Sequence, residues 1–209
     1  MTALNEAAGR GDRAALEALL EHHLPRLRAF VRLRAGAMLR ARESCSDLVQ
    51  SVCREVLTHR RRFRHPDEGA FRRWLFTTAQ RKLKNREAYH LAAKRDVLRD
   101  LPAGDALGPE DQRLVGDLFR TFSTPSGALA AREEIERLEA AFETLSDGQR
   151  EIVTLAHVAG LPRAAIAEHV GMSEGAVRVA LHRALAKLAA ELEEDEERPS
   201  RSGAPGRAS

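Results

Sequence analysis

The chain has 209 residues, of which 31% are charged and 4% aromatic, and its formal net charge is +3. This length allows one domain of ordinary size or two small ones, and the scarcity of aromatic residues favours helical bundles over a β-sandwich. No apolar run is long enough to cross a bilayer and no secretory signal opens the chain, so we expect a cytoplasmic protein without membrane insertion.

Helical periodicity marks three segments in the first hundred residues. Asp12 can cap the first, in which Pro25 predicts a break or a kink. Ser44 or Ser46 can cap the second. The third is predicted from near Gly69 into the nineties. Together they indicate an N-terminal helical bundle.

Basic side chains concentrate between Arg60 and Arg86, where ten lysines and arginines accompany two acidic residues. Such a block indicates a polyanionic partner, usually nucleic acid, although a solvated charged face is the alternative. Trp74 lies at helical spacing with Phe71, which favours core packing over base stacking. For Phe63, in the predicted loop, packing and stacking remain equally open.

Proline and glycine interrupt the pattern between residues 101 and 127, which predicts a linker. Periodicity returns at Glu133, and further helices are predicted over 147–159, 163–170 and 174–192. The fold class is therefore all-α, with two small helical domains joined by a flexible linker. The predicted boundaries are 1–97 for the first domain, 98–132 for the linker, 133–192 for a four-helix second domain and 193–209 for a disordered tail.

The second domain contains the spacing of a helix-turn-helix. Ala167 provides the small residue at the helix crossing, Gly171 the sharp turn, Ser173 an N-cap and Val177 the inward apolar residue. The alternative is a helical hairpin that only packs. A DNA-reading helix would present its outer face to the major groove, and we place on that face Ser173, Glu174, Ala176, Arg178, Val179, His182 and Arg183.

Four stretches resemble the extracytoplasmic-function group of bacterial sigma factors, in the sigma-70 family. Residues 145–153 and 166–184 resemble the fourth conserved region of that family. Upstream, residues 46–52 resemble its polymerase-binding segment, and residues 71–79 resemble its promoter-opening helix. The chain departs from the pattern at Ser146-Asp147-Gly148, where relatives place Pro-Glu, and in the linker, which is long for the group.

The resemblance implies a transcription initiation factor that is not an enzyme and needs no cofactor or metal. Its partners would be promoter DNA and the beta and beta-prime subunits of core RNA polymerase, and the family also allows an anti-sigma factor. Polymerase contacts would come from Asp47, Leu48, Gln50, Ser51 and Arg54. Contacts to the minus-ten element would come from Arg60, Arg61, Arg62, Phe63, Arg64, Arg72, Arg73, Lys82 and Asn85. The outer face of the helix-turn-helix would read the minus-thirty-five element.

Other classes fit less well. An enzyme would need a convergent reactive set, and the histidines and cysteines are scattered; Cys45 and Cys53 lie about 12 Å apart on one predicted helix, too far for a disulfide. A dimeric helix-turn-helix repressor or activator is the main alternative, but it has no use for a polymerase-binding segment. A protein-only adaptor would not need the basic block.

Because a flexible tether does not fix two sites at promoter spacing, we expect the free chain to bind promoter DNA poorly.

Overall fold

The computed structural model describes residues 2–60, 63, 67–92 and 131–197, and within these ranges the regular structure is helical, which confirms the all-α prediction. The elements of the first domain are α1 (Thr2–Gly9), α2 (Arg13–Arg34), α3 (Ala37–Arg40), α4 (Cys45–Thr58) and α5 (Glu68–Ala92). Those of the second are α7 (Ala131–Thr144), α8 (Asp147–Val153), the π-helix η3 (Thr154–Val158), α9 (Arg163–Val170) and α10 (Glu174–Glu197). The predicted linker segment 101–127 lies outside the described residues.

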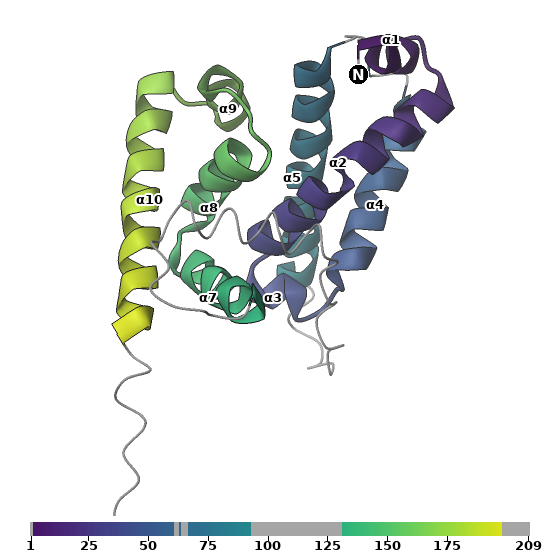
Figure 1. Ribbon diagram of the computed structural model, residues 1–209. Helices are drawn as coiled ribbons and strands as arrows, with labels where there is room; N and C mark the ends of the chain where they lie inside the picture. The colour runs from purple at the N-terminus through teal and green to yellow at the C-terminus, as the bar shows by residue number, and fades with distance from the viewer. Residues whose placement is uncertain (1, 61–62, 64–66, 93–130, 198–209) are drawn as a thin grey trace, which may run out of the picture.

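In the first domain, α2, α4 and α5 pack against one another and α1 lies across one end (Figure 1). The helix starts follow the predicted caps. The Asp12 carboxylate accepts a hydrogen bond from the Ala15 backbone N–H, and the Ser44 hydroxyl accepts one from that of Asp47. Of the two candidate serines, Ser44 is therefore the cap. The buried face of the bundle is formed by Leu16, Leu19, Leu27, Phe30, Leu48, Val52, Phe71, Leu75 and Phe76.

Of the two outcomes predicted for Pro25, a break or a kink, the break is wrong, because α2 runs without interruption from Arg13 to Arg34. Proline removes the hydrogen bond to the carbonyl of the residue four positions earlier, which is Glu21. Glu21 is exposed, so water can satisfy that carbonyl, and buried leucines on both sides of Pro25 anchor the helix in the bundle. The short helices α1 and α3 were not predicted, since four to eight residues carry too little periodicity.

The second domain packs α7, α8 and α9 against the long helix α10 (Figure 1). The predicted segment 147–159 becomes α8 followed by η3, whose first residue, Thr154, donates its hydroxyl hydrogen to the carbonyls of Arg150 and Glu151. The helix that begins at Glu174 continues to Glu197, so residues 193–197 do not belong to a disordered tail. Glutamate is a good helix former, and buried Leu192 anchors this last part of the helix.

The two domains lie against each other in this structure. Helix α2 contacts both η3 and α8, and the buried apolar residues of the two domains form one contiguous cluster. No helix within the described ranges is long and apolar enough to cross a membrane.

Candidate nucleic-acid and protein interfaces

The turn between α9 and α10 has the geometry that the sequence predicted. Gly171 adopts a left-handed conformation with φ of 69°, and the Met172 N–H donates to the Ala167 carbonyl at 3.0 Å, which closes the end of α9. The Ser173 hydroxyl accepts a hydrogen bond from the Ala176 N–H at 3.2 Å. Val177 is fully buried between the two helices. These contacts fix the direction in which α10 leaves the turn.

The outer face of α10 is open to solvent along its first three turns. Of the seven residues predicted to read DNA, six are exposed and Ala176 is half-buried. Val179 is 44% exposed beside Arg178, which gives the face an apolar spot next to a cation. Arginine reads guanine edges and small apolar groups meet thymine methyl groups, so the face suits a major groove. That these side chains touch DNA remains a prediction.

Helix α4 presents a polar face at the position of the predicted polymerase segment. Asp47, Gln50 and Arg54 are exposed and Ser51 is half-buried. Leu48 is fully buried against the bundle in this conformation, and its predicted contact with the polymerase stays a prediction. Leucine at this register belongs to the apolar side of an amphipathic helix and holds the polar side in place.

A shallow groove of about 400 Å³ runs between α4 and α5. Glu55 lies on the wall of this groove. Its carboxylate accepts a hydrogen bond from Arg81 Nη2 at 2.6 Å and another from Lys82 Nζ at 2.9 Å. Burial alone would raise the pKa of the Glu55 carboxyl, but hydrogen bonds from Lys82 and Arg81 outweigh it and lower that pKa. Lys82, a predicted minus-ten contact, is therefore engaged inside the domain.

The aromatic residues of the first domain form one cluster. Phe63 is 4% exposed and stacks on Trp74 with ring centroids 5.6 Å apart, and its edge meets Phe71. Trp74 packs against the core, as its spacing predicted. Phe63 also packs in this conformation, and its predicted contact with DNA stays a prediction. Its position in a loop carried no signal that would separate the two roles.

The remaining predicted minus-ten residues differ in accessibility. Arg73 and Asn85 are exposed, whereas Arg60 and Arg72 are half-buried. Arg73 Nη1 lies 3.4 Å from Glu168 Oε2 of the second domain. Three further predicted contacts fall outside the described residues, namely Arg61, Arg62 and Arg64.

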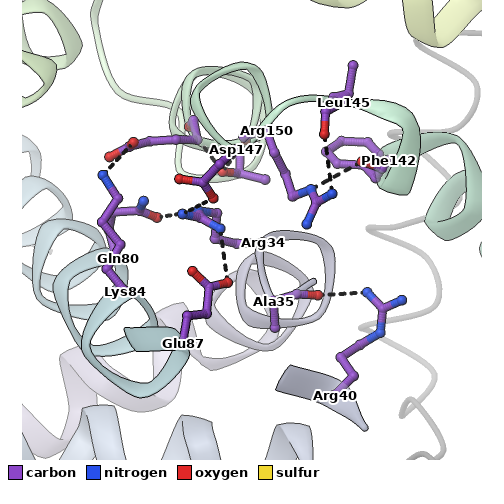
Figure 2. Close-up of polar contacts among 12 residues, drawn as sticks. Arg34, Ala35, Arg40, Gln80, Lys84, Glu87, Phe142, Leu145, Asp147 and Arg150 are labelled. Carbon is purple, nitrogen blue, oxygen red and sulfur yellow. Dashed lines mark hydrogen bonds and ion pairs between the residues drawn. The ribbon is translucent and has the colours of Figure 1, made fainter. Parts of the chain in front are cut away.

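Arg34 forms a buried polar centre that sequence reasoning missed (Figure 2). Its side chain is fully buried, and its Nε donates to Gln80 Oε1 at 2.9 Å. Its Nη1 lies 3.4 Å from Glu87 Oε1, and its Nη2 lies 2.7 Å from Asp147 Oδ1 of the second domain. One signal was available, because Arg34 follows Leu27, Phe30 and Val31 at helical spacing and so lies on the apolar side of α2.

Glu151 forms a second centre between the domains. Its carboxylate accepts a hydrogen bond from Lys84 Nζ of α5 at 2.7 Å. The same carboxylate lies 3.2 Å from Nε2 of His169 in α9. Burial raises the pKa of this carboxyl, but hydrogen bonds from His169 and Lys84 outweigh burial and lower the pKa to about 2.

This pKa predicts acid sensitivity. A carboxyl whose pKa is lower in the folded state stabilises the fold fully above its unfolded pKa, near 4.5, and loses that effect as pH falls toward 2. The free energy of unfolding should fall between pH 7 and pH 3 in both proteins. The fall should be about 1–2 kcal/mol smaller in Glu151→Gln than in the wild type. Urea denaturation at both pH values measures this, with Glu17→Gln, which removes an exposed pair within α2, as the control. Equal losses in Glu151→Gln and the wild type would contradict the role of Glu151.

The described residues contain no group of three histidine, cysteine or acidic side chains that could hold a metal ion. Cys45 and Cys53 are not joined in a disulfide, as their spacing predicted.

Comparison with known proteins gives matches over both domains. The family "Sigma-70 region 2" matches residues 19–93, and "Sigma-70, region 4" matches residues 135–188. The ECF RNA polymerase sigma factor SigD of Mycobacterium tuberculosis is 34% identical over 189 residues, which cover 87% of this chain and 79% of SigD. The ECF RNA polymerase sigma factor ShbA of Streptomyces griseus is 32% identical over 200 residues, covering 92% of this chain and 95% of ShbA.

Two solved structures share the fold. CnrH in complex with the cytosolic domain of CnrY gives a TM-score of 0.57 at 22% identity, covering 93% of this chain and 97% of CnrH. The sigma factor RpoE of Bartonella quintana, in complex with the anti-sigma factor NepR, gives a TM-score of 0.60 at 21% identity, covering 86% of this chain and 97% of RpoE.

Proposed function

Because the chain belongs to the extracytoplasmic-function RNA polymerase sigma factors of the sigma-70 family, we propose that it docks on core polymerase through α4 and directs it to promoters through α5 and α10. The observation that carries the proposal is the presence of two separate accessible faces on two domains. One is the exposed polar side of α4, and the other is the outer face of the helix-turn-helix.

In this proposal α10 reads duplex DNA and α4 binds protein. Arg178 and Arg183 are exposed and lie five residues apart near the start of α10, so one arginine can reach base edges while the other reaches a phosphate. Asp47, Gln50 and Arg54 follow one another on α4 at spacings of three and four residues, so they share one face toward the beta and beta-prime subunits.

Promoter melting would fall to the first domain. Open DNA needs cations along its backbone and pockets for unstacked bases. Arg73 and Asn85 are exposed on α5 and are available for such contacts. Promoter melting would take place in the cytoplasm, where polymerase acts. The complex of RpoE with the anti-sigma factor NepR supports an anti-sigma factor as a further partner.

The deciding experiment is run-off transcription with core polymerase and genomic DNA fragments, with and without this protein. We expect discrete transcripts only when it is present. A dimeric repressor or activator, the main alternative, would bind DNA without core polymerase and would not create transcripts with it.

The recognition helix yields a specific prediction. Arg178→Ala and Arg183→Ala should each weaken holoenzyme binding to duplexes selected from a random pool by the wild type. The expected loss is at least about 1 kcal/mol, or roughly fivefold, because a base-edge or phosphate contact disappears.

Fluorescence anisotropy at fixed salt measures the affinity of both variants. A base-reading arginine should also relax the selected sequence at one position, whereas a phosphate contact should weaken all sequences evenly. Lys187→Ala, an exposed cation farther along the same helix, is the matched control. Wild-type affinity in both arginine variants would contradict the assignment of α10.

A further inference from the structure

Two of the large apolar side chains that this protein exposes belong to the helix-turn-helix. Within the described ranges the exposed large apolar residues are Tyr89, Leu91, Met172 and Val179. Met172 lies in the turn between α9 and α10, and Val179 lies on α10, five residues after Glu174. Valine can neither pair with a phosphate nor hydrogen-bond a base edge, so its place on a proposed DNA-binding face needs a separate explanation.

Val179 lies on the line of α10 that points away from the rest of the domain. Helices α7, α8 and α9 pack on one side of α10 (Figure 1). That side carries the buried residues Val177, Ala184 and Leu188. The line that points outward is formed by exposed residues at spacings of four, three and four, namely Gly175, Val179, His182 and Ala186. Only His182 in this line can hydrogen-bond a base edge through its side chain.

The two arginines of this face flank the outward line. Successive residues of an α-helix are about 100° apart around the axis, so Arg178 and Arg183 lie about 140° apart with Val179 between them. A helix with its side chains is about 10–12 Å across and the major groove is about 12 Å wide, so the helix fills the groove from wall to wall. The arginines then lie toward the walls of the groove, and Val179 lies above the base edges of its floor.

The floor of the major groove offers one apolar group that valine can contact. Each base pair presents hydrogen-bond donors or acceptors there, and thymine adds its C5-methyl group. Valine placed over a donor or acceptor would displace water without replacing the hydrogen bond, which is unfavourable. Valine placed over a thymine methyl group removes apolar surface of both partners from water, which is favourable. Val179 therefore favours thymine over the other bases.

Gly175 gives the backbone of α10 room to approach the bases. It lies one turn before Val179 on the same line, and the N-terminal part of a recognition helix is the part that enters the groove. Glycine is unfavourable within a helix, yet the described part of the fold does not require it here, because a Cβ at Gly175 would meet only Ser173 Oγ, at 3.9 Å. Close approach of a ligand to the backbone is a reason for glycine that lies outside the fold.

We propose that Val179 is a specificity-determining residue that selects a thymine in the minus-thirty-five element through its C5-methyl group, and that Gly175 permits the close approach that this contact needs. The inference rests on the proposed function of α10 as the helix that reads this element. It predicts one position of the element at which thymine is preferred for its methyl group.

The test removes that methyl group without changing the base pairing. Core polymerase loaded with the full chain first selects duplexes from a random pool. Each thymine of the selected minus-thirty-five element, on either strand, is then replaced singly by deoxyuridine, which pairs with adenine in the same way. We expect one of these replacements to weaken wild-type binding about fourfold, the contribution of one buried methyl group.

Two variants show whether Val179 makes the contact. Val179→Ala shortens the side chain, so it should bind the thymine duplex at least about fourfold more weakly and lose nothing further at the sensitive deoxyuridine. The other thymines of the duplex are the internal control, and their replacement should affect the variant and the wild type equally. Val179→Ser introduces a hydroxyl group that can bond several bases, so a fresh selection with this variant should lose the thymine at this one position. Thermal melting of the free chains checks that both variants are folded.

Gly175→Ala tests the close approach with two readouts of opposite sign. It should raise the melting temperature of the free chain, because alanine is the better helix former. It should weaken DNA binding by the polymerase complex at least about fivefold, because the added methyl group lies between the helix and the DNA. Gly148→Ala is the matched control, since Gly148 lies two residues after the N-cap of α8 and also has open space around its Cβ position. It should raise the melting temperature likewise and leave DNA binding unchanged.

Deoxyuridine effects that are the same in Val179→Ala as in the wild type at every thymine would overturn the proposal, as would a selected element without a required thymine. Wild-type DNA affinity in Gly175→Ala would overturn the close approach of α10. These results leave sequence selection and transcription by the wild type intact, so the proposed function stands. A polymerase complex that selects no sequence would overturn the proposed function itself, and this inference with it.

Discussion

Replacing Arg34 by methionine is expected to lower the free energy of unfolding by about 3 kcal/mol, the loss typical of breaking a buried ion pair from one side. Methionine keeps the length and the apolar packing of the arginine stem but removes the charge. Glu87, Asp147 and Gln80 then lose their shared partner. Urea denaturation at pH 7 measures the loss.

Two further variants separate charge from packing. Arg34→Met combined with Glu87→Gln should recover at least about 1 kcal/mol, because it removes a carboxylate left without its cation. Arg13→Met removes an exposed arginine that pairs with Glu17 within one helix, and it should cost less than about 1 kcal/mol. Similar losses for Arg34→Met and Arg13→Met would mean that the buried network contributes nothing.

The destabilisation caused by Arg34→Met should also depend on pH, in a direction set by Glu87. Burial raises the pKa of the Glu87 carboxyl, and the nearby Arg34 charge opposes that rise. Without Arg34 the folded pKa of Glu87 should rise further above its unfolded value. A carboxyl of that kind favours the folded state as pH falls through its folded pKa, so the penalty of Arg34→Met should shrink on acidification.

The sequence predicted the helix-turn-helix well because each of its parts has a local cause. Gly171 supplies a left-handed backbone, Ser173 supplies a side-chain acceptor, and Val177 supplies an inward apolar group. None of these roles depends on residues far away in the chain. The same holds for the Asp12 cap and for the bounds of α9, which match the predicted 163–170.

Sequence reasoning was incomplete where distant residues decide which side chains are buried. Phe63 lies in a loop, and only the position of Trp74 and Phe71 makes it a core residue. Leu48 and Gln50 both lie in the resembling segment, and the packing of α4 on α2 determines which of them faces outward. The ion pairs between the domains were unforeseen for the same reason. The four-residue spacing of acidic residues from Glu139 to Glu151 is visible in the sequence. The sequence does not show which cations lie opposite these carboxylates.

Gln50→Arg is expected to weaken binding to core polymerase by about 2 kcal/mol or more, roughly thirtyfold, while leaving the fold near normal. Gln50 is exposed on α4, so a larger side chain there does not disturb the core. In the interface with core polymerase, however, the arginine places a bulky cation where the wild type has a neutral amide. Asp47 is a less decisive position, because its charge in the first turn also stabilises the helix by about 0.3–1 kcal/mol.

The measurement is co-purification with core polymerase, together with thermal melting of the free variant. Ala14→Arg, which adds the same charge at an exposed position of α2, serves as the matched control and should bind core polymerase normally. The ion pairs between the domains do not involve Gln50, so the variant should also remain as compact as the wild type. If Gln50→Arg melts normally and still binds core polymerase as the wild type does, the polymerase contact lies elsewhere than on this face of α4.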